Sequence, residues 1–241
     1  MARPLRARVL EGDAITDDLL RELWRLRLEM LTLTRPEEQD WAEFRGNVRG
    51  EGRFVFAFVD PDGVAQGFFT IATLPVDVTR RRLLLMYSKY FYFRPTHRGH
   101  PRTLLAPWVL LPIQLRRHGL RSLHFVTTAF PQSYVSLTRT AGRTWSLRQD
   151  TTPAWAREAL EAFGAHFCPE GFDPATGLVH GSNVADAESL PRSREARRLA
   201  EAYEQLNPYW RDGVSLPILF SVDARLVWHN ATRVLRRSLR R

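Results

Sequence analysis

A short basic turn in the middle of the chain carries the residue types best suited to binding an anion. Residues 94–103 read RPTHRGHPRT and hold three arginines and two histidines. Where a turn leads into a helix, unpaired backbone N–H groups and the helix dipole both favour negative charge. We therefore expect this turn to bind a phosphate or a pyrophosphate. The alternative is a solvated basic loop between two elements of the core.

The segments on both sides of this turn have to position it. Residues 83–93 are apolar and aromatic, which predicts a buried strand. Residues 103–117 have apolar side chains at helical intervals and are followed by Gly119, which predicts a helix that Pro112 should kink. Three cations fall in its last turn, where they complement the helix dipole: Arg116, Arg117 and His118.

The sequence FRPTHRG, from Phe93 to Gly99, resembles the V-x-P-x-x-R-G that ends the fourth strand of the GNAT superfamily of acyl-CoA-dependent N-acyltransferases. In that family an R/Q-x-x-G-x-G/A loop then wraps the cofactor pyrophosphate. This chain has the arginine and the first glycine, but Pro101 and Thr103 occupy the two later positions. Because Pro101 has no N–H to donate, we expect guanidinium groups rather than a backbone cradle to hold the phosphate.

The resemblance implies a co-substrate and a set of residues that bind it. The co-substrate would be acyl-CoA or an acyl-phosphopantetheine on an acidic acyl carrier protein, and the acceptor an amine on a small molecule or peptide. The closest likeness in character is to the N-acyl amino acid synthases, because the aromatic strand before the turn suits a long fatty acyl chain. The implied donor-binding residues are Tyr92, Phe93, Arg94, Arg98, Gly99, His100, Arg102 and Thr103.

Acyl transfer to an amine also needs a base that takes the amine's proton. The family commonly uses a carboxylate, but no Asp or Glu occurs between Asp77 and Asp150. His124 is a candidate base because histidine titrates near neutrality; the alternative is a hydrogen-bonded interior histidine. The other candidates are His97 in the turn and three carboxylates of the early helices: Glu29, Glu38 and Asp40.

Two further residues are candidates for catalytic roles. In the family a tyrosine often protonates the departing thiolate, but its position in this chain holds Thr138. Tyr134 lies one helical turn away and is the candidate acid, with a packing role as the alternative. Lys89 is the only lysine in a chain that otherwise uses arginine, and it lies within an aromatic segment. This position marks Lys89 as a third candidate.

The order of the expected elements resembles the family over residues 15–148. Two helices, the first capped by Thr16, precede a hairpin with strands at 54–59 and 64–74. A break at 75–80, the strand–turn–helix unit, another strand and a short helix follow. The expected fold class is α/β (α+β): a GNAT-like mixed, mostly antiparallel central sheet flanked by helices, with a splay between the fourth and fifth strands.

The chain is expected to form an acyltransferase core, residues 1–148, and a C-terminal extension, residues 149–241, that together make one unit. The extension would add helices and complete the sheet with a strand at 214–222. The resemblance implies that the donor's pantetheine arm enters the splay. It also implies that a backbone amide near Phe93 and Arg94 polarises the thioester carbonyl.

Composition limits the class of protein and its partners. With 241 residues, 44% of them hydrophobic, the chain can bury a sizeable core, and its net charge of +9 favours an acidic partner. The alternative to an enzyme is therefore a non-catalytic basic module that binds nucleic acid or an anionic membrane. Nucleic acid is the less expected partner, because no continuous basic tract precedes the C-terminus. Residues 224–241 predict a basic amphipathic helix that either contacts a membrane or packs on the domain.

The remaining sequence signals concern location and metals. The single cysteine, Cys168, excludes an intramolecular disulfide and favours a reducing compartment. The histidines are scattered, so we expect no metal site. We found no apolar segment long enough to span a bilayer and no signal-peptide core. We expect a cytoplasmic protein, with peripheral membrane contact through its C-terminal helix as an option.

Overall fold

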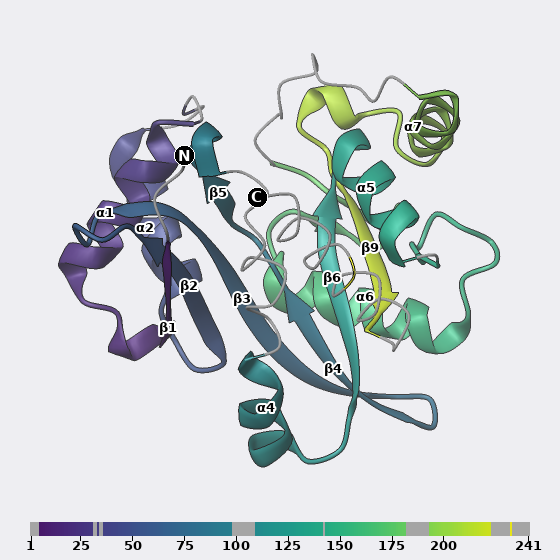
Figure 1. Cartoon of the computed structure of the whole chain (residues 1–241). Helices are drawn as coiled ribbons and strands as arrows, with labels where there is room; N and C mark the ends of the chain where they lie inside the picture. Colours follow the sequence, from purple (N-terminus) through teal and green to yellow (C-terminus); the bar gives the residue numbers. More distant parts are fainter. Residues whose placement is uncertain are drawn as a thin grey trace. The chain divides into compact units, whose positions relative to one another are not determined.

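The computed structural model describes residues 5–30, 33, 36–97, 109–141, 143–181, 193–222 and 232. Contacts within the chain define two units, each of which contains part of a β-sheet and several helices (Figure 1). Unit 1 comprises Met1–Thr73, Tyr87–Gly119 and Asn230–Arg241, and unit 2 comprises Leu74–Met86 and Leu120–His229. The expected boundary between residues 148 and 149 falls inside unit 2.

The sheet of unit 1 is antiparallel. Strand β2 (Arg53–Val59) pairs on one side with β1 (Arg6–Glu11) and on the other with the first part of β3 (Ala65–Val78). Strand β5 (Phe91–Phe93) pairs with the other side of β3. The hairpin β2–β3 confirms the sequence prediction, whereas β1 was not predicted.

Two helices of unit 1 bury their apolar faces against β2 and β3. Helix α1 (Asp17–Leu28) begins after Thr16, whose hydroxyl accepts a hydrogen bond from the N–H of Leu19, which confirms the predicted cap. Helix α2 (Glu37–Val48) begins after Pro36. Their core contacts include the buried side chains Leu20, Leu23, Phe44, Val55, Ala57 and Phe68. A short 3-10 turn, η1 (Gly12–Ala14), precedes α1.

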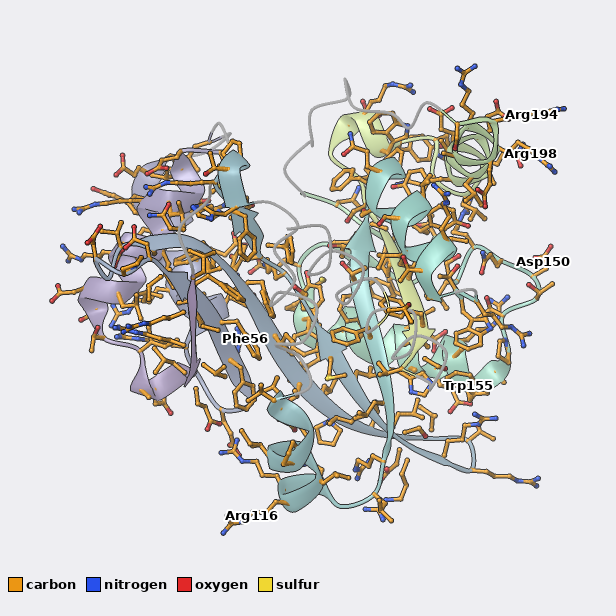
Figure 2. The ribbon with its side chains drawn as sticks, viewed as in Figure 1. Phe56, Arg116, Asp150, Trp155, Arg194 and Arg198 are labelled. Atoms are coloured by element: carbon orange, nitrogen blue, oxygen red, sulfur yellow. The ribbon has the colours of Figure 1, made fainter. Side chains whose placement is uncertain are left out.

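Helix α4 (Leu110–His118) is shorter than the predicted helix and ends at Gly119, which has a positive φ of 68°. The predicted kink at Pro112 is wrong. Pro112 is the third residue of α4, within the first turn, where a backbone N–H has no partner inside the helix. Arg116 points away from the ribbon, as Figure 2 shows. The 3-10 turn η2 (Pro95–His97) follows β5.

The sheet of unit 2 contains the end of β3, then β4 (Arg81–Tyr87), β6 (Ser122–Ala129) and β9 (Leu216–Ser221), in that order. Strands β4 and β6 run in the same direction (Figure 1), and β6 and β9 are antiparallel. The fold is therefore mixed α+β with mostly antiparallel strand pairs, as predicted. Strand β9 confirms the strand expected in the C-terminal extension.

Two strand predictions need correction. Residues 75–80 do not form a break, because β3 continues to Val78 and only Thr79 and Arg80 form the turn before β4. Pro75 fits within β3 because β2 pairs with β3 only as far as Ala72, so no ladder bond to β2 is lost. The single strand expected at 83–93 is interrupted, since β4 ends at Tyr87 and β5 starts at Phe91.

Among the described residues of unit 2, helices accompany the sheet. They are α5 (Pro131–Ala141), α6 (Ala154–Phe167) and α7 (Arg194–Leu206), and α7 is capped by Ser193. A small hairpin, β7 (Phe172–Asp173) and β8 (Leu178–Val179), lies within the segment expected as loop. The 3-10 turn η5 (Trp210–Asp212) precedes β9. Arg194 and Arg198 project outward from α7 (Figure 2).

Among the described residues, no helix has the length and hydropathy that crossing a membrane requires. The basic C-terminal helix predicted at 224–241 lies outside the described residues apart from Thr232. The predicted splay between the fourth and fifth strands involves parts of both units and stays a prediction.

Candidate functional site

Strand β5 turns part of its backbone away from β3. The N–H of Arg94 donates to the carbonyl oxygen of Gln66 at 3.0 Å, and the carbonyl oxygen of Tyr90 accepts from β3 as well. Backbone groups of alternate residues face the partner strand in an antiparallel pair, so the N–H and C=O of Phe91 and Phe93 point away from β3. The N–H of Arg94, near which the carbonyl-polarising amide was expected, is therefore bonded to Gln66 within unit 1.

The predicted donor-binding residues of β5 are held in place by their neighbours. Gly67 lies beneath the ring of Phe93, where a Cβ atom would overlap the ring. Tyr92 is half-buried, and burial raises its pKa while the Arg27 guanidinium opposes that rise. Arg94 forms a forked ion pair with Glu29, Nη2 to Oε1 at 2.7 Å and Nε to Oε2 at 2.9 Å. This pair lowers the pKa of Glu29.

A titratable cluster lies where β4 ends and β5 begins. Lys89 donates from Nζ to Oε1 of Glu43 on α2 at 3.0 Å, and both side chains are about one-third exposed. One turn along α2, Asn47 donates from Nδ2 to the hydroxyl of Tyr90 at 3.3 Å. Burial raises the pKa of Tyr90, and the charge of Glu43 adds to that rise. Tyr90 is therefore neutral near pH 7.

Sequence reasoning identified Lys89 but missed its partner Glu43. The available signal was the spacing of Glu43 and Asn47, which are four residues apart and so lie on one face of a helix. That spacing does not reveal which strand the face meets. The contact with Lys89 joins residues 46 positions apart in the chain.

A second carboxylate of α2 is fully committed to an ion pair. Asp40 accepts from both terminal nitrogens of Arg27, and its Oδ2 accepts from Nε1 of Trp24 at 3.0 Å. The side chains of Arg27 and Asp40 are each 1% exposed. The Arg27 guanidinium also lies 5.5 Å from the ring centre of Tyr90. Asp40 is thus closed to solvent, whereas Glu38, another candidate base, is exposed.

The two candidates in unit 2 lie at opposite ends of β6. His124 is 3% exposed and pairs across the ladder with Ser221, near the start of β6. Tyr134, on the helix that follows the other end of β6, is 4% exposed and packs on Tyr203 with ring centres 5.3 Å apart. Burial raises the pKa of Tyr134. Five residues of strand, at roughly 3.3 Å each, separate His124 from Ala129, so β6 does not bring this base and this acid together.

Five residues of the predicted phosphate loop lie outside the described residues: Arg98, Gly99, His100, Arg102 and Thr103. His97 closes the turn η2 and is half-buried. Within the described part of the chain, no three His, Cys, Asp or Glu side chains are grouped so that they could hold a metal ion.

Comparison with known proteins gave partial structural likenesses. No family model and no curated protein matches the chain. A probable N-acyltransferase from Enterococcus faecalis covers 58% of this chain at 14% identity and a TM-score of 0.42, and this chain spans about a third (32%) of its length. The match to an acetyltransferase from Trypanosoma brucei covers 58% of this chain and 93% of that protein, with 20% identity and a TM-score of 0.37. The match to an aminoglycoside N-acetyltransferase in complex with CoA covers 59% of this chain and 88% of that protein, with 12% identity and a TM-score of 0.42.

Proposed function

We propose that this chain is an acyltransferase that moves an acyl group from a phosphopantetheine thioester to an amine. The observation that carries the proposal is the outward-facing backbone of Phe91, which follows Lys89 of the Lys89–Glu43 pair by two residues, just after the interruption between β4 and β5. An extended arm with amide groups can hydrogen-bond along such a strand as an added strand would. The thioester at the end of the arm is then delivered towards titratable side chains.

Five residues of unit 1 have a role in this proposal. The arginines of the turn after β5, Arg98 and Arg102, hold the phosphate of the donor. The side chain of Phe91, 61% exposed, offers apolar surface beside the arm. Glu43 takes the proton of the attacking amine, and Lys89 holds that carboxylate in position. This assignment gives Lys89 a positioning role.

The finer details extend the same proposal. The donor is a fatty acyl thioester on coenzyme A or on an acidic acyl carrier protein, to which a chain of net charge +9 is attracted. The acceptor is an amine on a small molecule or peptide, as in the N-acyl amino acid synthases. His124 and Tyr134, which lie at opposite ends of β6, are the alternative candidates for base and acid. The protein works in the cytoplasm, with its basic C-terminal segment able to contact an anionic membrane.

Native mass spectrometry of the whole chain tests the donor. The chain is incubated with acetyl-CoA, palmitoyl-CoA or an acyl-loaded carrier protein, and in parallel with an oligonucleotide. We expect retention of a thioester donor, strongest for the long acyl chain, and at least about a tenfold weaker complex for Arg98→Ala, since a charge-assisted contact contributes roughly 1.5–3 kcal/mol.

Arg116→Ala is the matched control, because Arg116 is an exposed arginine on α4 that points away from the ribbon (Figure 2). It should retain the donor as the unaltered chain does. Retention of the oligonucleotide and of no thioester would reject the acyltransferase in favour of a basic binding module. Equal donor affinity in a folded Arg98→Ala variant would remove Arg98 from the site.

A further inference from the structure

Two side chains of unit 2 form a hydrogen-bonded pair of a hydroxyl and an imidazole that the proposed transfer does not require. His124 on β6 lies directly opposite Ser221 on β9. The N–H of Val222 donates to the carbonyl oxygen of Leu123 at 3.0 Å, so the adjacent pair His124–Ser221 is a non-hydrogen-bonded pair of the ladder. In such a pair both side chains share one face of the sheet, and their Cα atoms approach to about 4.5 Å.

The hydrogen bonds of His124 define which ring nitrogen carries the proton. Nδ1 lies 3.2 Å from the carbonyl oxygen of Ser122, and Nε2 lies 3.1 Å from Oγ of Ser221. A carbonyl oxygen only accepts, so Nδ1 carries the proton and donates it to that bond. In the neutral ring Nε2 is then an acceptor, and the hydroxyl of Ser221 donates to it. This is the arrangement in which an imidazole can take a proton from a serine.

The neutral ring is favoured and its orientation is restrained. Burial lowers the pKa of His124, and the positive charge of Arg81 lowers it further. The edge of His124 meets Trp155 on α6 with ring centres 5.1 Å apart, and Trp155 in turn packs on Trp145 at 5.0 Å. The Arg81 guanidinium lies 4.6 Å from the ring centre of Trp155. The imidazole is therefore held between its two hydrogen bonds and an aromatic wall.

The two members of the pair differ in exposure. His124 is 3% exposed, whereas Ser221 keeps partial exposure at the end of β9. A base that is shielded from water beside a partly exposed serine is the combination that a serine nucleophile needs. The backbone carbonyl of Ser122 stands where a carboxylate orients the histidine of a Ser-His-Asp triad.

We infer that this chain itself contains an acyl acceptor, Ser221, a serine nucleophile that His124 activates and that an acyl thioester acylates. In this step Oγ forms a bond to the acyl carbon while the C–S bond breaks. The hydroxyl proton passes to Nε2 of His124 and from there to the departing thiolate. The products are an ester on Ser221 and a free thiol, so atoms and charge balance without another reactant.

Covalent labelling of the whole chain tests this site. The probes are decanoyl-CoA and an alkyl fluorophosphonate, whose phosphorus would bond to Oγ as fluoride leaves. We expect one adduct per chain, mapped to Ser221 by peptide mass spectrometry and absent from Ser221→Ala. In His124→Gln the amide oxygen can accept the same hydrogen bond but takes no proton near pH 7. The labelling rate of this variant should fall at least about 100-fold, the lower end of general-base contributions.

Ser122→Ala is the matched control. Its hydroxyl bonds to the carbonyl oxygen of Arg82, while the main-chain carbonyl that orients His124 stays in place. Labelling of this variant should equal that of the unaltered chain. No adduct on the unaltered chain, an adduct on another residue, or equal rates for the unaltered chain and His124→Gln would overturn the inference.

The outcome of the labelling experiment does not depend on the acyltransferase proposal. Circular dichroism and thermal unfolding show whether each variant is folded, and His124→Asn replaces His124→Gln if the latter is not. Donor retention in native mass spectrometry reports on Phe91, Arg98 and their neighbours, whereas labelling reports on Ser221. One proposal can therefore fail while the other stands.

Discussion

The buried polar pairs of the two units differ in charge and in exposure. In unit 1, Arg27 and Asp40 are both charged, both 1% exposed and bonded through two parallel contacts. In unit 2, His124 and Ser221 form a neutral pair, and one member keeps partial exposure. The first pair is closed to solvent and both carboxylate oxygens of Asp40 are bonded, whereas the second contains a hydroxyl bonded to a base on a partly exposed residue. Complete burial of both charged partners indicates a structural pair, whereas partial exposure beside a shielded base indicates chemistry.

The physical reason for this difference is the cost of removing charge from water. An isolated buried charge costs several kcal/mol, roughly, so a buried carboxylate must be matched by a cation and by further donors. Asp40 receives both from Arg27 and Trp24. A neutral imidazole has a much smaller desolvation cost, so His124 needs only one carbonyl and one hydroxyl. Unit 2 can therefore bury a base that has only these two hydrogen-bond partners among the described residues.

The largest expected effect comes from breaking the charged pair. Asp40→Ala leaves Arg27 buried and uncompensated, which should lower the free energy of unfolding by about 3–5 kcal/mol. Urea unfolding, followed by hydrogen–deuterium exchange of peptides from α1 and α2, measures the loss and locates it in unit 1.

The double variant Arg27→Met with Asp40→Leu is the control, because it removes both charges and keeps apolar volume. It should recover most of the stability that Asp40→Ala loses. A loss of under about 1 kcal/mol for Asp40→Ala would show that the pair behaves as an exposed ion pair does, and the contrast between the units would disappear.

A smaller effect should distinguish the neutral pair by its pH dependence. Because the pKa of His124 is lower in the folded chain than its ordinary value, the unfolded chain binds a proton more readily. The contribution of His124 to stability is complete above the unfolded pKa of about 6.5 and falls as the pH decreases below it, by at most about 1.4 kcal/mol per pH unit. Urea unfolding at pH 5 and pH 8 measures this slope.

His124→Gln should reduce the slope of the unfolding free energy between pH 5 and 8, whereas Arg27→Met with Asp40→Leu should leave that slope unchanged, since this double variant keeps His124. If His124→Gln keeps the full slope, another group is responsible and His124 is not the buried neutral base that the pair requires.

The smallest effect on stability is expected at Lys89. Its pair with Glu43 is about one-third exposed, so Lys89→Met should change the free energy of unfolding by less than about 1 kcal/mol. If Lys89 positions Glu43 as a base, the same variant should lower kcat for amine acylation more than it raises KM. Lys89→Arg, which keeps the charge, should restore part of kcat. Unchanged kinetics in a folded Lys89→Met variant would leave the pair a surface contact only.

Sequence patterns predicted the elements whose determinants lie close together in the chain. The cap at Thr16, the hairpin β2–β3 and the end of α4 at Gly119 each depend on residues a few positions apart. The strand expected after the strand–turn–helix unit and the strand expected at 214–222 are likewise present in unit 2, as β6 and β9. Such signals are intrinsic to the local backbone and side chains, so they can be recognised before any tertiary contact is known.

Tertiary structure alone decided which of these elements meet, and with them the chemistry of both candidate sites. Sequence singled out Lys89 and His124 by type and position, but their partners Glu43 and Ser221 lie 46 and 97 residues away. The register of β6 against β9, and of β5 against β3, determines which side chains face each other and which amides turn outward. A shift of one residue in either register would send those groups to the opposite face. Register depends on packing over the whole sheet, and no short stretch of sequence contains that information.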